Sequence, residues 1–521
     1  MQVLNSVLRN LSLPRACLVA LLFGALNVLS FAPFFIWPLQ VISASLMMLI
    51  LVSHPEWNKK QQALLGLSYG FGSFVFGVCW LVIAMSRYGG MPYALSVIAL
   101  ALLAAFMAIF PALCFVAVHS LQSKWKTSDP ITLLVLFPVS WTVFEFLRGH
   151  LFTGFPWLSI GYAHNVSPLV GFAPVVGVYG VGGIAMLTSA CIALLFLRRS
   201  ARSLGAIGLL LIVISGIGLQ QLSWTEANGK PISVRLTQGN IDQGIKFTSS
   251  FLDETLAMYA DLMTAQAADL IATPETALPL LLTELPSTYL PRLQDFASQT
   301  NSRIVIGVVS DDGRQQYSNS VIGLGDKQGT AYRYDKHHLV PFGEYVPFGF
   351  RWFVNMMQIP LGEYNNPGVV QPAMAVKDQW VMPNICYEDL FGEEIAQQLR
   401  AQAVTPQGAA TILLNVSNLA WFGDLTAIPQ HLQISQMRSL ETGRPMLRST
   451  NTGATAIIDA RGQVVSQLPS LTRGTLAGQV QGMRGLTPYI RFGNWLWMVF
   501  AAMAMLGAYI VSQRQAKKTR T

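Results

Sequence analysis

Three stretches of the chain place a reactive side chain directly after an apolar, strand-like run. The side chains are a carboxylate, an ammonium and a thiol, carried by Glu275, Lys336 and Cys386. The stretches read IATPETALP, YDKHHLVPFGEYVPFG and PNICYEDLFG. A thiolate can attack a carbonyl, a carboxylate can take the thiol proton, and an ammonium can stabilise the resulting oxyanion. The set therefore indicates nucleophilic catalysis by cysteine.

Cys386 stands where a strand-like run ends and a helical pattern begins a few residues later. Such an elbow exposes the side chain and brings backbone N–H groups that lower a thiol pKa and bind an oxyanion. A buried structural cysteine is the competing interpretation. Within 232–482 Cys386 has no second cysteine with which to form a disulfide, because the other four fall in long apolar runs. That isolation favours the nucleophile.

Residue type gives weaker evidence for the identity of the base and of the cation than for the identity of the nucleophile. His337, His338 and His431 are the only histidines of 232–482, and no local signature marks any of them as the partner of a cysteine. Glu275 is an alternative base, because burial can tune a carboxylate for proton transfer. Glu344 could orient Lys336 and compensate its charge. An ordinary loop carboxylate and a solvated lysine remain the competing interpretations.

The sequence lacks the motifs that are typical of metal-dependent and nucleotide-binding enzymes. The chain contains no HExxH or CxxC motif, no cluster of histidines, no Walker loop and no GxGxxG that opens a helix, so we expect neither a metal nor a cofactor. Transport is a rival function of another class. Ionisable residues inside a span mark transport pathways, and Glu145 is the only carboxylate that the pattern places there. Local pairing with Arg148 is its alternative explanation.

The elements that must position these residues divide into membrane spans and one long polar segment. The chain is 52% hydrophobic and 12% charged, which is far below the charge of soluble domains. A span takes about 20 mostly apolar residues. Eight runs qualify: 14–31, 34–53, 64–85, 92–120, 131–147, 170–197, 204–222 and 493–512. We therefore expect a seven-span membrane domain over 1–222, a catalytic domain over 232–482 and a C-terminal span over 493–512.

The distribution of charge along the chain predicts its orientation in the membrane and argues against nucleic acid as a partner. With a cytoplasmic N-terminus, the inner loops and tails hold 13 Lys and Arg, and the short outer loops hold only Arg87 and Arg148. The segment 232–482 is then extracytoplasmic and both termini are cytoplasmic. Although the whole chain carries +8, this segment has 16 Lys and Arg against 22 Asp and Glu. A domain of net charge −6 is not expected to bind nucleic acid.

The catalytic segment alternates strand-like and helix-like stretches, which is typical of an α/β or layered sandwich domain. The pattern predicts strands over 233–240, 269–275, 303–310, 318–325, 330–340, 380–388, 410–418, 446–451 and 454–462. It predicts helices over 248–268, 288–300, 391–403 and 428–442. The strand order does not follow from the pattern.

The three catalytic stretches, in this order and spacing, resemble the Glu, Lys and Cys motifs of the nitrilase superfamily. Over nearly its whole length the chain resembles the apolipoprotein N-acyltransferases, the membrane-embedded branch of that superfamily. The resemblance extends through FEFLRGHLFTGFPW (144–157), LTQGNIDQGIKF (236–247), NVSNLAWFGD (415–424) and HLQISQMRSLETGRPMLRSTNTGATAIID (431–459). Two departures stand out: Phe247 occupies a position where related enzymes can carry Trp, and Leu419 one where SNDAWF is common. Both are expected to alter lipid contacts.

The resemblance implies a four-layer αββα catalytic domain in which Glu275 is the general base, Lys336 the oxyanion stabiliser and Cys386 the nucleophile. It implies supporting roles for Glu344, Tyr387 and Glu388, and substrate contacts for Phe247, Tyr345 and Trp421. The implied reaction moves an acyl chain from a membrane phospholipid to the α-amine of diacylglyceryl-cysteine in apolipoproteins, through a thioester, at the periplasmic side of the bacterial inner membrane. A membrane-tethered amidase with water as acceptor is the alternative.

Overall fold

The computed structural model describes residues 2–197, 199–311, 316–326, 331–346, 349, 351 and 364–518. The chain forms two compact units. The helical unit comprises Met1–Cys79, Tyr93–Ser223 and Phe492–Thr521, and the α/β unit comprises Trp80–Pro92 and Trp224–Arg491. The short segment Trp80–Pro92 thus groups with the α/β unit although it lies far from it in sequence, which the hydropathy pattern did not predict.

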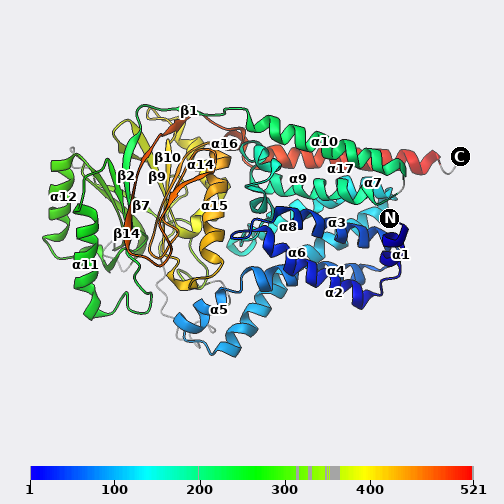
Figure 1. The fold of residues 1–521 in the computed structure, drawn as a ribbon, viewed down its shortest axis with the longest axis horizontal. Coiled ribbons are helices and arrows are strands. Elements are labelled where there is room, and N and C mark those ends of the chain that lie inside the picture. The colour runs from blue at the N-terminus through cyan, green and yellow to red at the C-terminus, as the bar shows by residue number, and fades with distance from the viewer. Residues whose placement is uncertain are drawn as a thin grey trace. The chain divides into compact units, whose positions relative to one another are not determined.

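The helical unit consists of long apolar helices (Figure 1). Its principal helices are α2 (Leu13–Asn27), α3 (Trp37–Ser53), α4 (Lys59–Gly77), α6 (Tyr93–Trp125), α8 (Phe137–Arg148), α9 (Ala173–Leu195), α10 (Arg199–Gln220) and α17 (Trp495–Lys518). Among the described residues, six helices are long and apolar enough to cross a membrane, and a seventh counts if α4 and the broken helix after it are one span. The apolar helix α3 has only 17 residues. The sequence-based count of eight spans stays a prediction.

Small residues let the helices of this unit approach backbone to backbone. A Cβ atom on Gly24 of α2 would lie 2.0 Å from the Tyr69 carbonyl oxygen of α4, and one on Gly72 of α4 would lie 2.1 Å from the Leu21 carbonyl oxygen of α2. Only glycine fits at such a distance. Close packing of this kind is what holds apolar helices together where burial of apolar surface offers no driving force.

Glu145, the ionisable residue inside a predicted span, is engaged within the helical unit. Its Oε1 lies 3.6 Å from Arg148 Nη2 and accepts a hydrogen bond from the Ile160 N–H at 2.9 Å. Arg148 also donates to the Trp157 carbonyl oxygen at 2.8 Å and to Ser159 Oγ at 3.2 Å. The pair therefore organises the loop that follows α8, which agrees with the local-pairing explanation.

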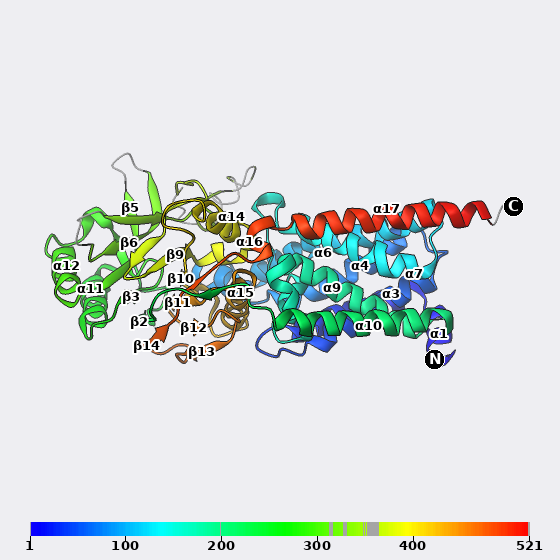
Figure 2. The same cartoon turned by 90° about the horizontal axis from the view of Figure 1, so that it is seen from above.

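The α/β unit contains two large sheets (Figures 1 and 2). The first has the order β14-β2-β3-β5-β6-β7, with β4 paired to β5. The second has the order β13-β12-β11-β10-β9-β8. The strands of the first sheet are β2 (Ile232–Gln238), β3 (Leu270–Ala272), β4 (Leu278–Leu281), β5 (Arg303–Asp311), β6 (Tyr317–Leu324), β7 (Tyr332–Asp335) and β14 (Gly474–Val480). Those of the second are β8 (Met374–Val376), β9 (Gln379–Ile385), β10 (Ile412–Ser417), β11 (Met446–Thr450), β12 (Ala456–Ile458) and β13 (Val464–Gln467).

Helices cover the outer face of each sheet. In Figure 1, α11 (Ser249–Thr264) and α12 (Tyr289–Thr300) flank the first sheet, and α14 (Gly392–Gln402) and α15 (Ala427–Thr442) flank the second. One apolar core joins the two sheets, with Leu236 and Leu270 from the first and Val381 and Leu414 from the second. Two further cores join each sheet to its own helices. The layer order is therefore αββα, as the family resemblance implied.

The predicted elements of the catalytic segment are confirmed with small shifts in their bounds. All four predicted helices and all nine predicted strands are present. The strand expected over 330–340 ends at Asp335, because the chain leaves the sheet at Lys336. Among the strands that the pattern missed are β4, β8, β13 and β14, which are short or carry few β-branched residues.

Candidate active site

The three reactive residues follow three strands whose carboxyl ends meet at one edge of the two sheets. Glu275 comes after β3, Lys336 after β7 and Cys386 after β9. Strand β3 runs parallel to β5, and β7 is also parallel to β5 because two antiparallel pairings separate them. In α/β sheets the carboxyl ends of parallel strands are where ligands bind.

Lys336 lies between two carboxylates. Its Nζ donates to Glu275 Oε1 at 3.2 Å and to Glu344 Oε1 at 2.8 Å. The lysine is 1% exposed and Glu275 is 7% exposed. A lysine so buried is not a solvated strand residue, and a carboxylate so paired is not an ordinary loop residue. Because an unpaired buried charge costs several kcal/mol, all three groups are expected to depend on one another.

Two asparagines that the sequence pattern did not single out complete this cluster. The Asn319 Nδ2 group, on β6, donates to Glu275 Oε1 at 2.7 Å and to Glu344 Oε1 at 2.9 Å. The Asn418 N–H, just after β10, donates to Glu275 Oε2 at 2.9 Å. Glu275 is thus held by donors from both sheets. The only sequence signal for these asparagines is their position beside strand ends.

The environment changes the proton affinities of the reactive groups. Burial by itself would lower the pKa of Lys336, but the carboxylates of Glu275 and Glu344 outweigh it and raise that pKa well above its usual value. Burial raises the pKa of the Cys386 thiol, and Glu275 raises it further; Lys336 lowers it only in part. At neutral pH the lysine is therefore an ammonium and the cysteine carries its proton, so nucleophilic attack by this thiol would require a base.

Backbone strain marks Cys386, the predicted nucleophile. Cys386 has φ +51°, a left-handed conformation that L-residues other than Asn and Asp rarely adopt. Strain of this kind persists only where the surroundings hold it, and it concentrates at functional sites. Thr276, directly after Glu275, also has positive φ, at +47°. The turn around Glu275 lies against β5, where a Cβ atom on Gly307 would be 2.1 Å from the Pro274 carbonyl oxygen.

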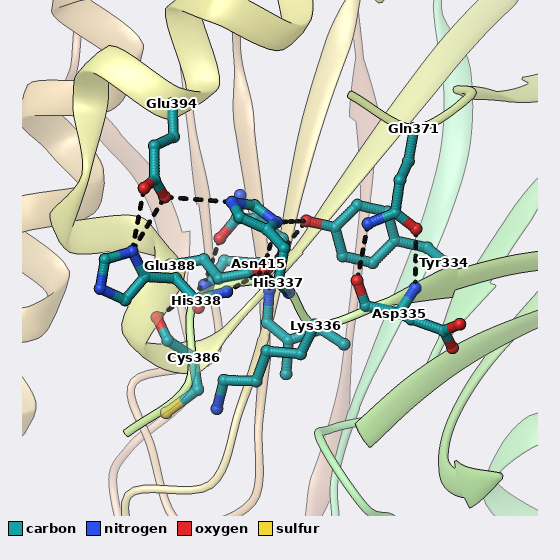
Figure 3. A network of polar contacts seen from close by, with 12 residues as sticks. Tyr334, Asp335, Lys336, His337, His338, Gln371, Cys386, Glu388, Glu394 and Asn415 are labelled. Atoms are coloured by element: carbon teal, nitrogen blue, oxygen red, sulfur yellow. Dashed lines mark hydrogen bonds and ion pairs between the residues drawn. The ribbon is translucent and has the colours of Figure 1, made fainter. Parts of the chain in front are cut away.

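A charged network lies behind the cysteine and lysine (Figure 3). Glu388 accepts hydrogen bonds from the Ile385 N–H at 2.6 Å and the His337 N–H at 2.6 Å. The two His337 ring nitrogens face two carboxylates, Nδ1 at 2.6 Å from Glu388 and Nε2 at 3.0 Å from Glu394. Figure 3 shows the Lys336 and Cys386 side chains pointing together to the side away from this network. Glu388 thus ties the segment that carries Lys336 to the segment that carries Cys386.

His337 in this network is an imidazolium. Burial would lower its pKa, but Glu388 and Glu394 raise it to about 10. The same contacts hold the pKa of Glu388 below its usual value and lower that of Glu394 to about 2, against the effect of burial. The ion cluster therefore stays charged across the whole range of pH in which the protein is expected to work.

We expect His337→Gln to destabilise the protein in a pH-dependent way. Because the folded pKa of His337 is raised from 6.5 to about 10, its contribution is fully present below about pH 6.5 and is lost as pH rises through about 10. The difference in Tm between wild type and variant should therefore be largest near pH 6 and shrink towards about pH 10. Thermal unfolding of the detergent-purified proteins measures it. A difference that does not change with pH would contradict the imidazolium.

Two histidines that remained as candidate bases have other partners. The His431 Nε2 lies 3.2 Å from the Cys386 carbonyl oxygen, and its Nδ1 lies 2.8 Å from Arg448 Nη2. His338 Nδ1 lies 3.0 Å from Glu394. The contacts of His431 given above are therefore with the main chain of Cys386 and with a guanidinium, and Glu275 remains the candidate base.

The remaining predicted residues have contacts with other residues of the α/β unit. The Tyr387 ring packs edge-on against His338, with ring centroids 5.7 Å apart. Trp421 is 40% exposed and contacts Tyr88 of the segment Trp80–Pro92, with centroids 5.7 Å apart. The Tyr345 carbonyl oxygen accepts a hydrogen bond from the Phe342 N–H at 3.0 Å.

The two departures from the family pattern differ in their surroundings. Phe247 is 58% exposed, and its expected effect on lipid contacts stays a prediction. Leu419 is 1% exposed and belongs to the core between the second sheet and its helices. The expectation that Leu419 alters lipid contacts is therefore wrong, because its side chain is buried in that core.

Lys246 is a further buried cation beside the cluster that residue type did not reveal. It is 2% exposed, and its Nζ lies 3.5 Å from the Glu275 carbonyl oxygen. Burial lowers its pKa to about 8, against the effect of Glu275. Within the described ranges, no three His, Cys, Asp or Glu side chains lie together in a way that could hold a metal ion.

Comparison with known families agrees with this architecture. Residues 234–489 match the carbon-nitrogen hydrolase family, and residues 23–191 match the apolipoprotein N-acyltransferase N-terminal domain. Fold and site together thus define an α/β enzyme of the nitrilase-like class joined to a unit of apolar helices.

Three relatives of similar length show to which family within this class the chain belongs. The chain is 46% identical to the apolipoprotein N-acyltransferase of Ralstonia nicotianae, over 91% of this chain and 90% of that protein. It is 41% identical to that of Nitrosomonas europaea, over 96% and 98%, and 37% identical to that of Haemophilus influenzae, over 92% and 91%. The chain belongs to the apolipoprotein N-acyltransferase family.

Proposed function

We propose that the protein transfers an acyl chain from a membrane phospholipid to the N-terminal α-amine of diacylglyceryl-cysteine in apolipoproteins, in two steps through a thioester on Cys386. The observation that carries the proposal is the buried Lys336 ammonium between Glu275 and Glu344, at the same strand edge as Cys386. This cluster combines a nucleophile, a base and a fixed positive charge in a chain of the apolipoprotein N-acyltransferase family.

In the first step Glu275 takes the thiol proton while the Cys386 sulfur attacks the ester carbonyl carbon of the phospholipid. The Lys336 ammonium and a backbone N–H beside Cys386 stabilise the oxyanion. When the tetrahedral intermediate collapses, the ester C–O bond breaks and Glu275 returns the proton to the leaving oxygen. A lysophospholipid departs, and a thioester remains on Cys386.

In the second step the acceptor amine attacks the thioester carbonyl. An N-terminal amine has a pKa of about 7.7–8.0, so a useful fraction is neutral at working pH. Glu275 accepts a proton from the attacking nitrogen, the C–S bond breaks, and the Cys386 thiolate regains a proton. Neither step needs a metal or a cofactor. Exclusion of water protects the thioester between the steps.

The membrane arrangement that we propose fits both substrates. The apolar helices lie in the bacterial inner membrane, the α/β unit faces the periplasm and both termini are cytoplasmic. This orientation is supported by the distribution of Lys and Arg, which are concentrated in the loops that it places in the cytoplasm. Both substrates are lipids, so a site at the membrane surface can reach them without their leaving the bilayer.

Intact-mass spectrometry tests the proposal. Detergent-purified protein is incubated with phosphatidylethanolamine and then with a diacylglyceryl-cysteine peptide. We expect the protein to gain the mass of one acyl chain, to lose it on treatment with hydroxylamine or with the peptide, and to yield acylated peptide. If the protein gains no mass and the peptide stays unmodified, the proposal fails. Release of free fatty acid without acylated peptide would instead indicate an amidase-like hydrolase that uses water.

A further inference from the structure

The carbonyl oxygen of the nucleophile residue itself is held by two side chains from other elements. His431 Nε2, on α15, lies 3.2 Å from the Cys386 oxygen, and Asn415 Nδ2, on β10, lies 3.4 Å from it. Both side chains are buried, with His431 1% and Asn415 0% exposed. The proposed transfer gives this carbonyl no role of its own.

The partner of the other ring nitrogen fixes the tautomer of His431. Arg448 Nη2 lies 2.8 Å from His431 Nδ1, and a guanidinium carries donors only. Nδ1 must therefore accept, so a neutral imidazole carries its proton on Nε2 and donates it to the Cys386 oxygen. Burial and the charge of Arg448 keep the pKa of His431 well below its usual value, which maintains the neutral ring.

Arg448 is in turn anchored. Its Nη1 lies 3.2 Å from Asp389 Oδ2, and Ser435 Oγ contacts both groups. Asp389, Arg448 and Ser435 are each completely buried. A continuous chain of contacts therefore runs from Asp389 through Arg448 and His431 to the Cys386 carbonyl.

Holding this carbonyl also orients the amide on the same peptide. A trans peptide is planar, and its C=O and N–H point in opposite directions. Fixing the Cys386 oxygen towards His431 thus fixes the direction of the Tyr387 N–H, the backbone donor that follows the nucleophile. The positive φ of Cys386 means that its backbone would not keep this conformation without such contacts.

We infer that His431 is a positioning residue for acyl transfer, which sets the Cys386–Tyr387 peptide so that the Tyr387 N–H meets the oxyanion. The inference rests on the proposed function. An oxyanion forms at the same place in both half-reactions, so a misaligned donor slows both. Misplacement by about 1 Å can reduce a rate about 100-fold.

The test compares His431→Leu, His431→Gln and the control Gln436→Ala in the full-length, detergent-purified protein. Leucine removes the donor. Glutamine can accept from Arg448 through its oxygen and donate to Cys386 through its nitrogen, as histidine does. Gln436 lies on the same helix, and its Nε2 donates to the Gly462 carbonyl oxygen at 2.8 Å, away from Cys386. Time-resolved intact mass measures acylation by phosphatidylethanolamine and deacylation by the acceptor peptide, and thermal unfolding measures stability.

We expect His431→Leu to slow both half-reactions by a similar factor, about 10- to 100-fold, with little change in the phospholipid KM. Gln436→Ala should match wild type, and His431→Gln should recover most of the rate. If His431→Leu acylates and deacylates within threefold of a wild type that is itself acylated, the inference is wrong. If His431→Gln is as slow as His431→Leu and both lose equal Tm, His431 only fills space. A wild type that gains no acyl chain contradicts the proposed function instead.

Discussion

Cys386→Ala is expected to leave no acyl adduct after incubation with phospholipid and no acylated acceptor peptide. Loss of a nucleophile from a catalytic set costs on the order of 10⁶-fold in rate, because no other group can form the covalent intermediate. The thiol projects towards the same side as Lys336, away from the buried network (Figure 3), so its removal should leave the fold intact. Intact mass and release of lysophospholipid measure the effect.

The matched control is Cys191→Ala, which removes a buried thiol from α9 of the helical unit. It should acylate at the rate of wild type. An adduct of the same size on Cys386→Ala would show that another residue carries the acyl chain. Unchanged release of lysophospholipid by Cys386→Ala, without an adduct, would show that no thioester forms on Cys386.

Glu275→Gln is expected to reduce the rate of acylation by about 10² to 10⁴ at neutral pH. The amide keeps the size of the side chain but cannot take the thiol proton, and the pKa of Cys386 is raised well above neutral pH. The variant then depends on the small fraction of thiolate. Its rate should therefore rise about tenfold per pH unit between pH 7 and 9. Acylation followed by intact mass at each pH measures this slope.

Glu284→Gln serves as the control for a carboxylate of the same segment. Glu284 is exposed at the surface, where it accepts a hydrogen bond from the Leu281 N–H at 3.2 Å. It should acylate at the wild-type rate with the wild-type pH dependence. If Glu275→Gln stays slow at every pH, or if it is as fast as wild type at neutral pH, Glu275 is not the base that deprotonates Cys386.

The elements of the catalytic segment could be predicted because their signals are local. Strands such as β5 and β10 are runs of Ile, Val and Leu, and helices such as α12 show a 3.6-residue apolar period. The order of the strands could not be predicted, because parallel pairings such as β9 with β10 join segments separated by whole helices.

The candidate site likewise has one part that residue type predicts and one part that depends on the tertiary structure. Residue type identified Glu275, Lys336 and Cys386, but each had a plain structural alternative until burial was known. Lys336 and Glu275 are 61 positions apart in the chain, so no sequence period relates them. The contributions of Asn319 and Asn418 had only a weak signal, their position beside strand ends, since a buried asparagine near a strand end is common in structural networks.

The sequence by itself determined the apolar helices, the strand-and-helix content of the α/β unit and the chemical groups available for catalysis, because hydropathy, periodicity and residue type are properties of short segments. Only the tertiary structure decided that Lys336 is a buried ammonium between two carboxylates. It also brought His431 to the carbonyl of Cys386, 45 residues away. The physical reason is that burial and opposing charge set protonation and orientation, and both arise only when distant segments pack together.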